Sequence, residues 1–188
     1  EGVDASVLIE IDGNKVDVEA RKQAFLEIVK KSDVMGYITA DTEEEQENLW
    51  HVRRSISPAI SKLRPKKINE DIVVPTSKIP EAVEFMKKLS AEYRLDIVLF
   101  GHFGDGNVHT NLMVDPEDKD ELQRVETVLD KIFKYVISVN GSITGEHGIG
   151  ISKKPFMKYQ FTPVEMELFK NIKNAFDPHN LLNPGKIF

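Results

Sequence analysis

Residues 100–111 constrain the fold of this chain more than any other segment. Their Asp105-Gly106 pair lies between two apolar-rich runs, and Asp-Gly in that setting is a strong signal for a β-hairpin. A type I′ turn at this pair places His102 opposite His109, with Cβ atoms about 4.5–5.5 Å apart on one face of the sheet. Two imidazoles held in this way can bind one divalent ion. Asn111 lies on the same face, because side chains alternate along a strand.

The rest of the chain alternates between strand and helix patterns. Predicted strands cover residues 6–12, 36–40, 71–74 and 96–101. Predicted helices cover residues 17–31, a segment carrying Trp50 and Ile56, residues 79–93, a long stretch that opens at Pro116, and a last helix with a Thr162/Glu165 capping box. Antiparallel strands joined by a hairpin and by helical crossovers predict an α+β fold. The nearest description is a ferredoxin-like antiparallel sheet with helices packed on one face. A doubly wound α/β fold is less favoured, because the hairpin is hard to place in a parallel sheet.

The composition narrows the class of protein. With 188 residues, 40% of them hydrophobic, the chain can bury the core of one domain. The net charge is −6 and the Lys and Arg residues are scattered, which argues against a surface for nucleic acid. No apolar run approaches the roughly 18–20 residues that a membrane span needs. Cysteine is absent, so disulfides and thiol chemistry are excluded, and we expect a cytoplasmic protein.

The two ends of the chain each carry a signal. The first residues lack the basic and apolar regions of a signal peptide and lead at once into a strand pattern, so we expect a piece of a longer protein. The tail, residues 177–188, ends in proline, glycine and two apolar residues. We therefore expect this tail to be docked rather than frayed.

A second motif, Gly-Glu-His-Gly-Ile-Gly at residues 145–150, follows the long predicted helix. Its glycines let the backbone turn sharply and bring Glu146 and His147 to one place. A carboxylate that joins the two hairpin histidines gives a ligand set of two histidines and one glutamate, which leaves coordination positions open. His147 is a candidate general base, because imidazole titrates near neutral pH. The glycine spacing does not fit a phosphate-binding loop.

Other polar residues are less distinctive. A histidine in a strand is more often a hydrogen-bonded core residue than a ligand, but a histidine pair beside a glycine-flanked acid–histidine pair favours a functional site. His51 and His179 have no such setting and are expected on the surface. Arg53 and Ser57 share a face of the predicted helix, and an arginine fork matches a carboxylate. An ordinary exposed arginine near acids such as Glu47 explains Arg53 equally well.

Taken together, these segments resemble the C-terminal domain of FAD-linked oxidases of the vanillyl-alcohol oxidase superfamily. Within it, they resemble the branch that contains glycolate oxidase, D-lactate dehydrogenase and D-2-hydroxyglutarate dehydrogenase. The motifs that carry the resemblance are residues 101–111, residues 145–150 with 153–156, Asp177-Pro178 with residues 182–186, the Trp50-x-x-Arg53 pair and residues 69–75. The resemblance spans essentially the whole chain.

The resemblance implies a flavin-dependent oxidoreductase that acts on a 2-hydroxy acid, with hydride passing from C2 to N5 of FAD. Residues 1–188 would be its cap domain, which covers the flavin and holds the substrate. The N-terminal FAD-binding domain of the family is absent from this chain, so we expect no activity from the chain alone. The FAD-binding domain is the implied partner. Whether an electron-acceptor protein or a quinone is a further partner, and whether the protein forms oligomers, is left open by the resemblance.

The resemblance also implies roles for particular residues. A divalent metal, zinc or manganese, would be held by His102, His109 and Glu146, and His147 would be the base. The implied substrate-binding residues are Arg53, Ser57, Lys67 and Asn111. Lys67 stands for a substrate-binding lysine of the family. If that lysine is located by counting back from Pro75, Asn69 occupies its position instead. The residues that would approach the flavin are Asn183 and Lys186.

Two alternatives belong to other functional classes. A stand-alone metallohydrolase would use the same ligand set to activate water, although the His-Glu-x-x-His helix signature of such enzymes is missing. A non-catalytic ferredoxin-like module would bind a ligand or partner, but it leaves the two polar clusters without a purpose.

Overall fold

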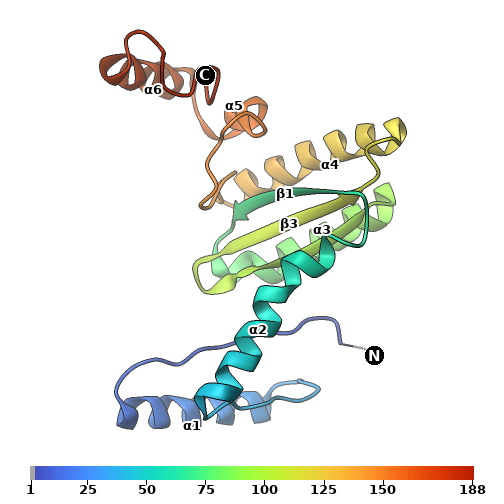
Figure 1. Ribbon diagram of the computed structural model, residues 1–188, viewed down its shortest axis with the longest axis vertical. Helices are drawn as coiled ribbons and strands as arrows, with labels where there is room; N and C mark the ends of the chain where they lie inside the picture. Colours follow the sequence, from blue (N-terminus) through green and yellow to red (C-terminus); the bar gives the residue numbers. More distant parts are fainter. Residues whose placement is uncertain (1–2) are drawn as a thin grey trace. The chain divides into compact units, whose positions relative to one another are not determined.

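The computed structural model describes residues 3–188 (Figure 1). The chain divides into two compact units, Glu1–Ala59 and Ile60–Phe188. The first unit contains helix α1 (Lys15–Lys31) and all but the last residue of helix α2 (Glu43–Ile60). Both helices form where the sequence predicts them. The side chain of Asn14 caps α1, and the acidic residues at the start of α2 favour its positive N-terminal dipole.

The strands predicted at residues 6–12 and 36–40 are wrong. Within residues 3–188, neither segment forms regular secondary structure, and Val7 and Ile38 are 70% and 82% exposed. Strand propensity stabilises a strand only where a neighbouring strand pairs with its backbone and one face is covered. These two segments have the apolar pattern of strands but not the pairing.

The second unit contains the sheet. Its strands are β1 (Lys66–Val73), β2 (Asp96–His102) and β3 (Asn107–Val114). Its helices are α3 (Ile79–Tyr93), α4 (Lys119–Ser138), α5 (Met157–Gln160) and α6 (Pro163–Phe176), with short 3-10 turns η1 (Thr76–Lys78), η2 (Phe103–Asp105) and η3 (Lys154–Phe156). Residues 79–93 form the helix that the sequence predicts, whereas β1 begins five residues before the predicted strand.

The sheet is antiparallel, with the order β1-β3-β2, which confirms the α+β prediction. From β1 to α4 the elements follow the strand–helix–strand–strand–helix order of a ferredoxin-like fold. In place of a last strand, a single antiparallel bridge joins Ser142 to Val73 at the end of β1. Among the described residues, the ferredoxin-like sheet is therefore three strands and one bridge.

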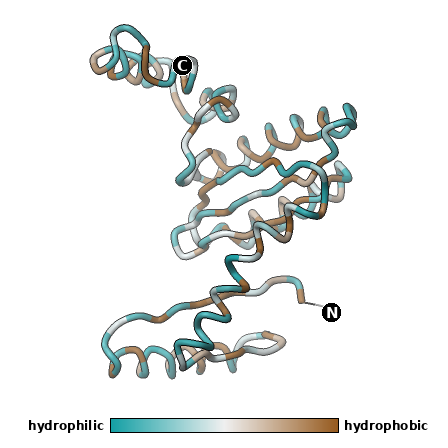
Figure 2. Tube along the Cα trace, in the orientation of Figure 1, coloured by the Kyte–Doolittle hydropathy of each residue, from teal (hydrophilic) through white to brown (hydrophobic). Residues whose placement is uncertain are grey.

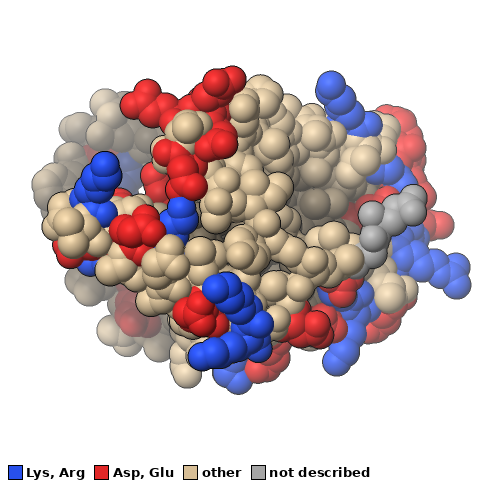
Figure 3. Space-filling view, turned by 90° about the horizontal axis from the view of Figure 1, so that it is seen from below, with Lys and Arg blue, Asp and Glu red and all other residues tan. Residues whose placement is uncertain are grey.

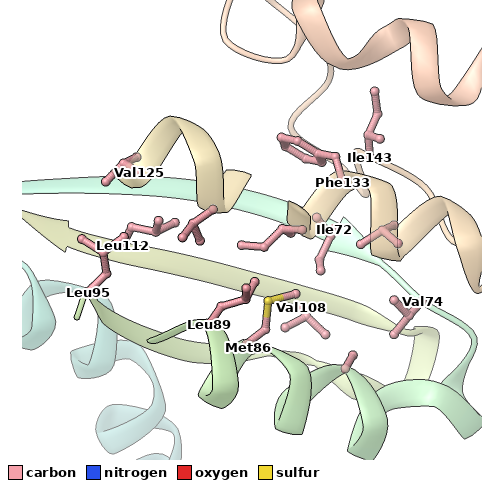
Figure 4. Packing of buried hydrophobic residues seen from close by; sticks show 14 of the residues in the cluster. Ile72, Val74, Met86, Leu89, Leu95, Val108, Leu112, Val125, Phe133 and Ile143 are labelled. Atoms are coloured by element: carbon pink, nitrogen blue, oxygen red, sulfur yellow. The ribbon is translucent and has the colours of Figure 1, made fainter. Parts of the chain in front are cut away.

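Helices α3 and α4 pack on one face of this sheet, as predicted. Figure 4 shows Ile72, Val108 and Leu112 of the sheet in one buried cluster with Met86 of α3 and Phe133 of α4. Apolar and polar residues alternate along α4 in Figure 2, as expected for an amphipathic helix. Because side chains alternate along each strand, the opposite face, called here the polar face, carries polar residues such as Asp71, His109 and Asn111 beside the apolar Phe100 and Met113.

Charged side chains of both signs lie on the outside of the molecule. On the face drawn in Figure 3, Lys and Arg are interspersed with Asp and Glu. Among residues 3–188, no helix combines the length and the apolar character that crossing a bilayer requires.

The hairpin between β2 and β3 forms, but its predicted register is wrong. His102 pairs with Asn107 rather than with His109. The connection is the 3-10 turn Phe103–Asp105 and not a two-residue type I′ turn. The Asp105 carboxylate accepts a hydrogen bond from the His102 ring (2.8 Å), which stabilises this longer loop. Because the register differs by two residues, both imidazoles stay on the predicted face of the sheet.

Two glycines allow loops to approach the end of β1. Gly106, which closes the hairpin loop, has φ +87°, and a Cβ there would lie 2.1 Å from the carbonyl oxygen of Val74. A Cβ on Gly141, just after α4, would lie 2.2 Å from the carbonyl oxygen of Val73. Any larger residue at either position would displace a loop that leads into the polar face of the sheet.

Both ends of α4 are set by local capping. The helix begins at Lys119 rather than at Pro116, because the side chain of Asp118 accepts the N–H of Glu121 (2.9 Å). It ends near Asn140, which has φ 61°, the left-handed conformation typical of a helix C-terminus. The Asn140-Gly141 pair therefore ends the helix.

The capping box that the sequence predicts for the last helix is also present, with Thr162 and Glu165 bonded in both directions. The tail after α6 is docked, as predicted. The buried Asp177 carboxylate accepts the N–H groups of residues 181–182 (2.8 and 2.9 Å) and pairs with Lys173. Farther along, the N–H of Ile187 donates to the carbonyl of Gly150 (2.8 Å).

The Asp177 contacts predict a pH-dependent contribution to stability. The hydrogen bond from Lys173 and the N–H groups of the tail lower the pKa of Asp177, outweighing its burial. A carboxyl whose folded pKa is lowered stabilises the fold above its unfolded pKa of about 3.9, and this stabilisation disappears as the pH falls. We therefore expect Asp177→Asn to lower the thermal unfolding midpoint at neutral pH, with the gap to wild type closing below about pH 4.

Glu167→Gln, an exposed acid on α6, is the control and should leave the midpoint unchanged. A gap between wild type and Asp177→Asn that is the same at pH 3 and pH 7 would contradict this account.

Candidate metal centre

Three predicted metal ligands meet at one place on the polar side of the sheet. His102 ends β2, His109 lies on β3, and Glu146 lies in the loop after α4. One ligand atom from each residue lies within 4.8 Å of the other two. The Oε1 atom of Glu146 is 3.3 Å from Nε2 of His102 and 3.6 Å from Nε2 of His109. The structure therefore brings together the residues that the two sequence motifs single out.

Asp105 orients the first of these histidines. The Nδ1–H of His102 donates to both carboxylate oxygens of Asp105 (2.8 and 2.9 Å), which leaves Nε2 as the atom that faces Glu146. This hydrogen bond raises the pKa of His102, against the smaller effect of burial. A carboxylate that holds the outer nitrogen of a histidine is the usual support of a metal-bound imidazole.

His109 is the most enclosed of the three ligands, with 8% of its surface exposed. Burial and the neighbouring His147 lower its pKa, which favours the neutral imidazole, the form that binds metals. Its ring lies between those of His102 and His147, at centroid distances of 5.5 and 5.4 Å.

The chemistry of these donors fits a divalent cation. Two imidazole nitrogens and a carboxylate oxygen converge, and all three are acceptors when the histidines are neutral. Such groups repel one another unless a proton or a cation lies between them. Nitrogen and oxygen donors in this number are those of catalytic zinc sites, in which a further position stays open.

A buried ion pair supports the loop that carries Glu146. Asp71 of β1 is fully buried, and one of its oxygens, Oδ2, accepts the N–H groups of residues 145–147 at 2.7, 2.6 and 3.0 Å. Lys153, 2% exposed, pairs with the other oxygen and also donates to the Asp71 carbonyl (2.7 Å). Burial alone raises the pKa of Asp71, but Lys153 and the backbone N–H groups outweigh it and hold the pKa well below its usual range.

Sequence reasoning assigned no role to Asp71 or Lys153. The sequence signal that could have found Asp71 is an acidic residue in an apolar strand, because Asp71 is followed by Ile-Val-Val. A carboxylate at such a position requires a buried partner.

The predicted base, His147, lies at the open side of the cluster. Its side chain is 47% exposed, and its ring stacks nearly parallel on His109, at an interplanar angle of 17°. Its Nδ1 is 3.6 Å from Asp71 Oδ1, and its Nε2 is 3.8 Å from Glu146 Oε1. These distances are longer than hydrogen bonds, so the His147 ring is hydrogen-bonded to neither carboxylate.

The predicted substrate residue Asn111 is fully buried within the sheet. Its Oδ1 accepts from Asn69 Nδ2 (2.7 Å), and its Nδ2 donates to the carbonyls of Val98 and His109 (3.1 Å each). Lys67 and Asn69 lie two residues apart on β1 and share the face that carries Asn111 and His109. Lys67 and its alternative Asn69 thus both lie on the face of the sheet that carries His109.

The remaining predicted site residues belong to α2 and to the tail. Arg53 and Ser57 are one turn apart on α2 in the first unit, and both are partly buried. Asn183 and Lys186 are exposed in the tail, where the N–H of Lys186 donates to the carbonyl of Asn183 (3.2 Å). Their roles toward substrate and flavin stay predictions. The histidines expected on the surface, His51 and His179, are exposed.

Comparison with known protein families identifies the family of this chain. The family described as FAD linked oxidases, C-terminal domain, matches residues 1–187, and the chain belongs to that family.

Named relatives extend the comparison. The chain is 42% identical over 184 residues to the glycolate oxidase subunit GlcD of Bacillus subtilis, which covers 98% of this chain and 39% of the relative. It is 39% identical over 168 residues to the D-2-hydroxyglutarate dehydrogenase of Stutzerimonas stutzeri, covering 87% and 36%. It is 32% identical over 187 residues to the probable mitochondrial D-lactate dehydrogenase of Danio rerio, covering 98% and 38%. The chain thus spans less than two fifths of the length of each of these relatives.

The buried ion pair gives a prediction for stability. We expect Lys153→Met to lower the free energy of unfolding by about 3–5 kcal/mol, because the Asp71 carboxylate would be left buried without its cation. Lys154→Met, at the exposed neighbouring position, should change it by no more than about 0.5 kcal/mol. Urea denaturation at neutral pH measures both variants, and equal effects would show that the pair contributes nothing of its own.

Proposed function

We propose that this chain is the substrate- and metal-binding domain of a flavin-dependent 2-hydroxy-acid dehydrogenase or oxidase. The observation that carries the proposal is the convergence of His102, His109 and Glu146 beside the half-exposed His147. The names of the relatives supply the substrate class, because glycolate, D-lactate and D-2-hydroxyglutarate are all 2-hydroxy acids. A partner domain that binds FAD is proposed from the family and from the greater length of the relatives.

A 2-hydroxy acid offers two oxygen groups, the hydroxyl and the carboxylate, on adjacent carbons. The open side of the cluster can receive both oxygens, since three protein donors leave coordination positions free. Arg53 is proposed to balance the charge of the carboxylate through a bidentate contact, with Ser57 beside it. Lys67 or Asn69 would hold the remaining polar groups of the substrate, and the buried Asn111 would orient Asn69 through their hydrogen bond rather than touch the substrate.

The proposed chemistry divides between this domain and the groups that it would hold. A divalent cation, zinc or manganese, supplies Lewis acidity that lowers the pKa of a bound hydroxyl. When bound to the partner domain, FAD supplies the acceptor for the hydride that leaves C2. His147 would take the hydroxyl proton, for which its half-exposed side chain is available. The histidines and Glu146 orient the hydroxyl toward that base, and Asn183 and Lys186 are proposed to approach the flavin.

A metal titration tests the ligand set. We expect one zinc or manganese ion to bind per chain to metal-stripped protein in a calorimeter, and His109→Ala to abolish binding at this site, because His109 supplies an enclosed neutral donor. His179→Ala removes an exposed histidine of the tail and should leave the stoichiometry and affinity unchanged. Binding of equal strength in His109→Ala would refute the proposed ligand set.

The support of His102 can be tested separately. We expect Asp105→Asn to weaken metal binding by about 10–100-fold without changing the stoichiometry, because loss of a carboxylate partner loosens a ligating histidine. Asp120→Asn, an exposed acid in the first turn of α4, is the matched control. An affinity of Asp105→Asn equal to that of the control would mean that His102 needs no such support.

A further inference from the structure

The loop of residues 144–148, called here the Glu146 loop, poses a structural problem. It has no regular helix or strand, and residues 145–148 are exposed. A metal ligand must nevertheless be held within about 0.5 Å of its working position. Something other than secondary structure must therefore hold the Glu146 loop in place.

Asp71 provides that support through the backbone. Three consecutive N–H groups, from residues 145–147, converge on its Oδ2 atom. Successive N–H groups directed at one anion form a compact cradle, and hydrogen bonds to an ionised carboxylate are stronger than those between neutral groups. The loop is thus held by its main chain at the residues whose side chains form the site.

The position of Asp71 in the sheet gives this contact its significance. Asp71 of β1 pairs directly with His109 of β3, so the two side chains lie side by side on one face. Asp71, which anchors the loop, and His109, the most enclosed of the proposed metal ligands, are therefore directly paired residues of neighbouring strands. The hydrogen bonds between Asp71 and the loop thus fix Glu146 and His147 relative to His109.

Only a carboxylate can make all of these contacts at once. Lys153 takes one oxygen of Asp71 while the three N–H groups take the other. An amide in the same place has one acceptor oxygen, and its NH2 group would face either Lys153 or the loop N–H groups as a second donor. Asparagine would therefore retain the shape of Asp71 but lose half of its acceptors.

We propose that Asp71 is a positioning residue, which registers Glu146 and His147 of the Glu146 loop against His109 of the hairpin. The inference rests on the proposed function, because it gives Asp71 a role in the metal centre rather than in the fold alone. Lys153 keeps the carboxylate in place and balances its charge. The neighbouring acid Glu70 is also buried, and its Oε2 lies 3.7 Å from Lys153 Nζ, but this oxygen accepts no N–H of the Glu146 loop.

Amide hydrogen exchange tests the anchor directly. In the wild-type chain we expect the amides of residues 145–147 to exchange at least about tenfold more slowly than unprotected peptide amides, despite the exposure of the loop, because each hydrogen bond must open first. In Asp71→Asn we expect this protection to fall by about tenfold or more. Unprotected amides at residues 145–147 in the wild-type chain overturn the proposal, and this measurement does not depend on whether the variant folds.

Metal binding tests the consequence for the site. We expect Asp71→Asn to bind one zinc ion about 10–100-fold more weakly than wild type. The visible absorption of bound Co2+, which depends on the coordination geometry, should also change, because Glu146 is no longer held at the histidines. A folded Asp71→Asn chain with wild-type zinc affinity and an unchanged Co2+ spectrum overturns the proposal.

The matched control is Glu121→Gln, which removes another buried and ion-paired carboxylate. Glu121 bonds Arg64 (2.8 Å) and the N–H of Asp115 (2.7 Å) at the opposite end of β3 from the hairpin. We expect this variant to unfold at a lower temperature but to keep its zinc affinity within about twofold, because it does not touch the Glu146 loop. Equal weakening of zinc binding in both variants would mean general destabilisation, and the proposal would fail.

The same experiments separate this proposal from the proposed function. If the wild-type chain binds no zinc, the proposed metal centre fails, while the exchange of residues 145–147 in Asp71→Asn still decides whether Asp71 holds the loop. If His109→Ala abolishes zinc binding and Asp71→Asn leaves it unchanged, the metal centre stands and the positioning role of Asp71 fails.

Discussion

The two-sided backbone pairing of β3 is the constraint on which the rest of the second unit depends. Hydrogen bonding along both edges fixes which side chains face α3 and α4 and which face the opposite side. Val108 and Leu112 therefore enter the core, whereas His109 and Asn111 line the polar face. A slip of one residue would exchange these sets. Because β3 supplies both core residues and the site residue His109, the packing that stabilises the fold also fixes the position of the site.

The sequence predicts the parts of the fold and site that depend on local chemistry. The capping box of Thr162 and Glu165 follows from residues within one turn of the helix start. The hairpin is predicted with the wrong turn, since the Asp105 side chain stabilises a longer loop. The shared face of His102 and His109 is still predicted correctly, because a shift of two residues preserves the alternation of side chains.

The parts that sequence could not predict depend on distant partners. Lys153 contacts Asp71 across 82 positions of the chain, and nothing in the local pattern around either residue indicates the other. The hydrogen bonds that hold residues 145–147 come from main-chain groups, which every sequence has, so no residue type marks them. The strand patterns at residues 6–12 and 36–40 failed for the same reason, because pairing depends on a neighbouring strand and not on composition.

Asp71 holds residues 145–147 through their main-chain N–H groups. The support of the loop therefore does not depend on which side chains these residues carry. The anchor holds the N–H of Glu146 rather than its side chain, and would hold another residue at that position along the same path. Metal preference is set by the donor atoms, so a single substitution at position 146 can alter it while the loop keeps its course. In evolution or in design, a change of donor at position 146 would therefore alter the metal preference of the proposed centre without the loop having to be rebuilt.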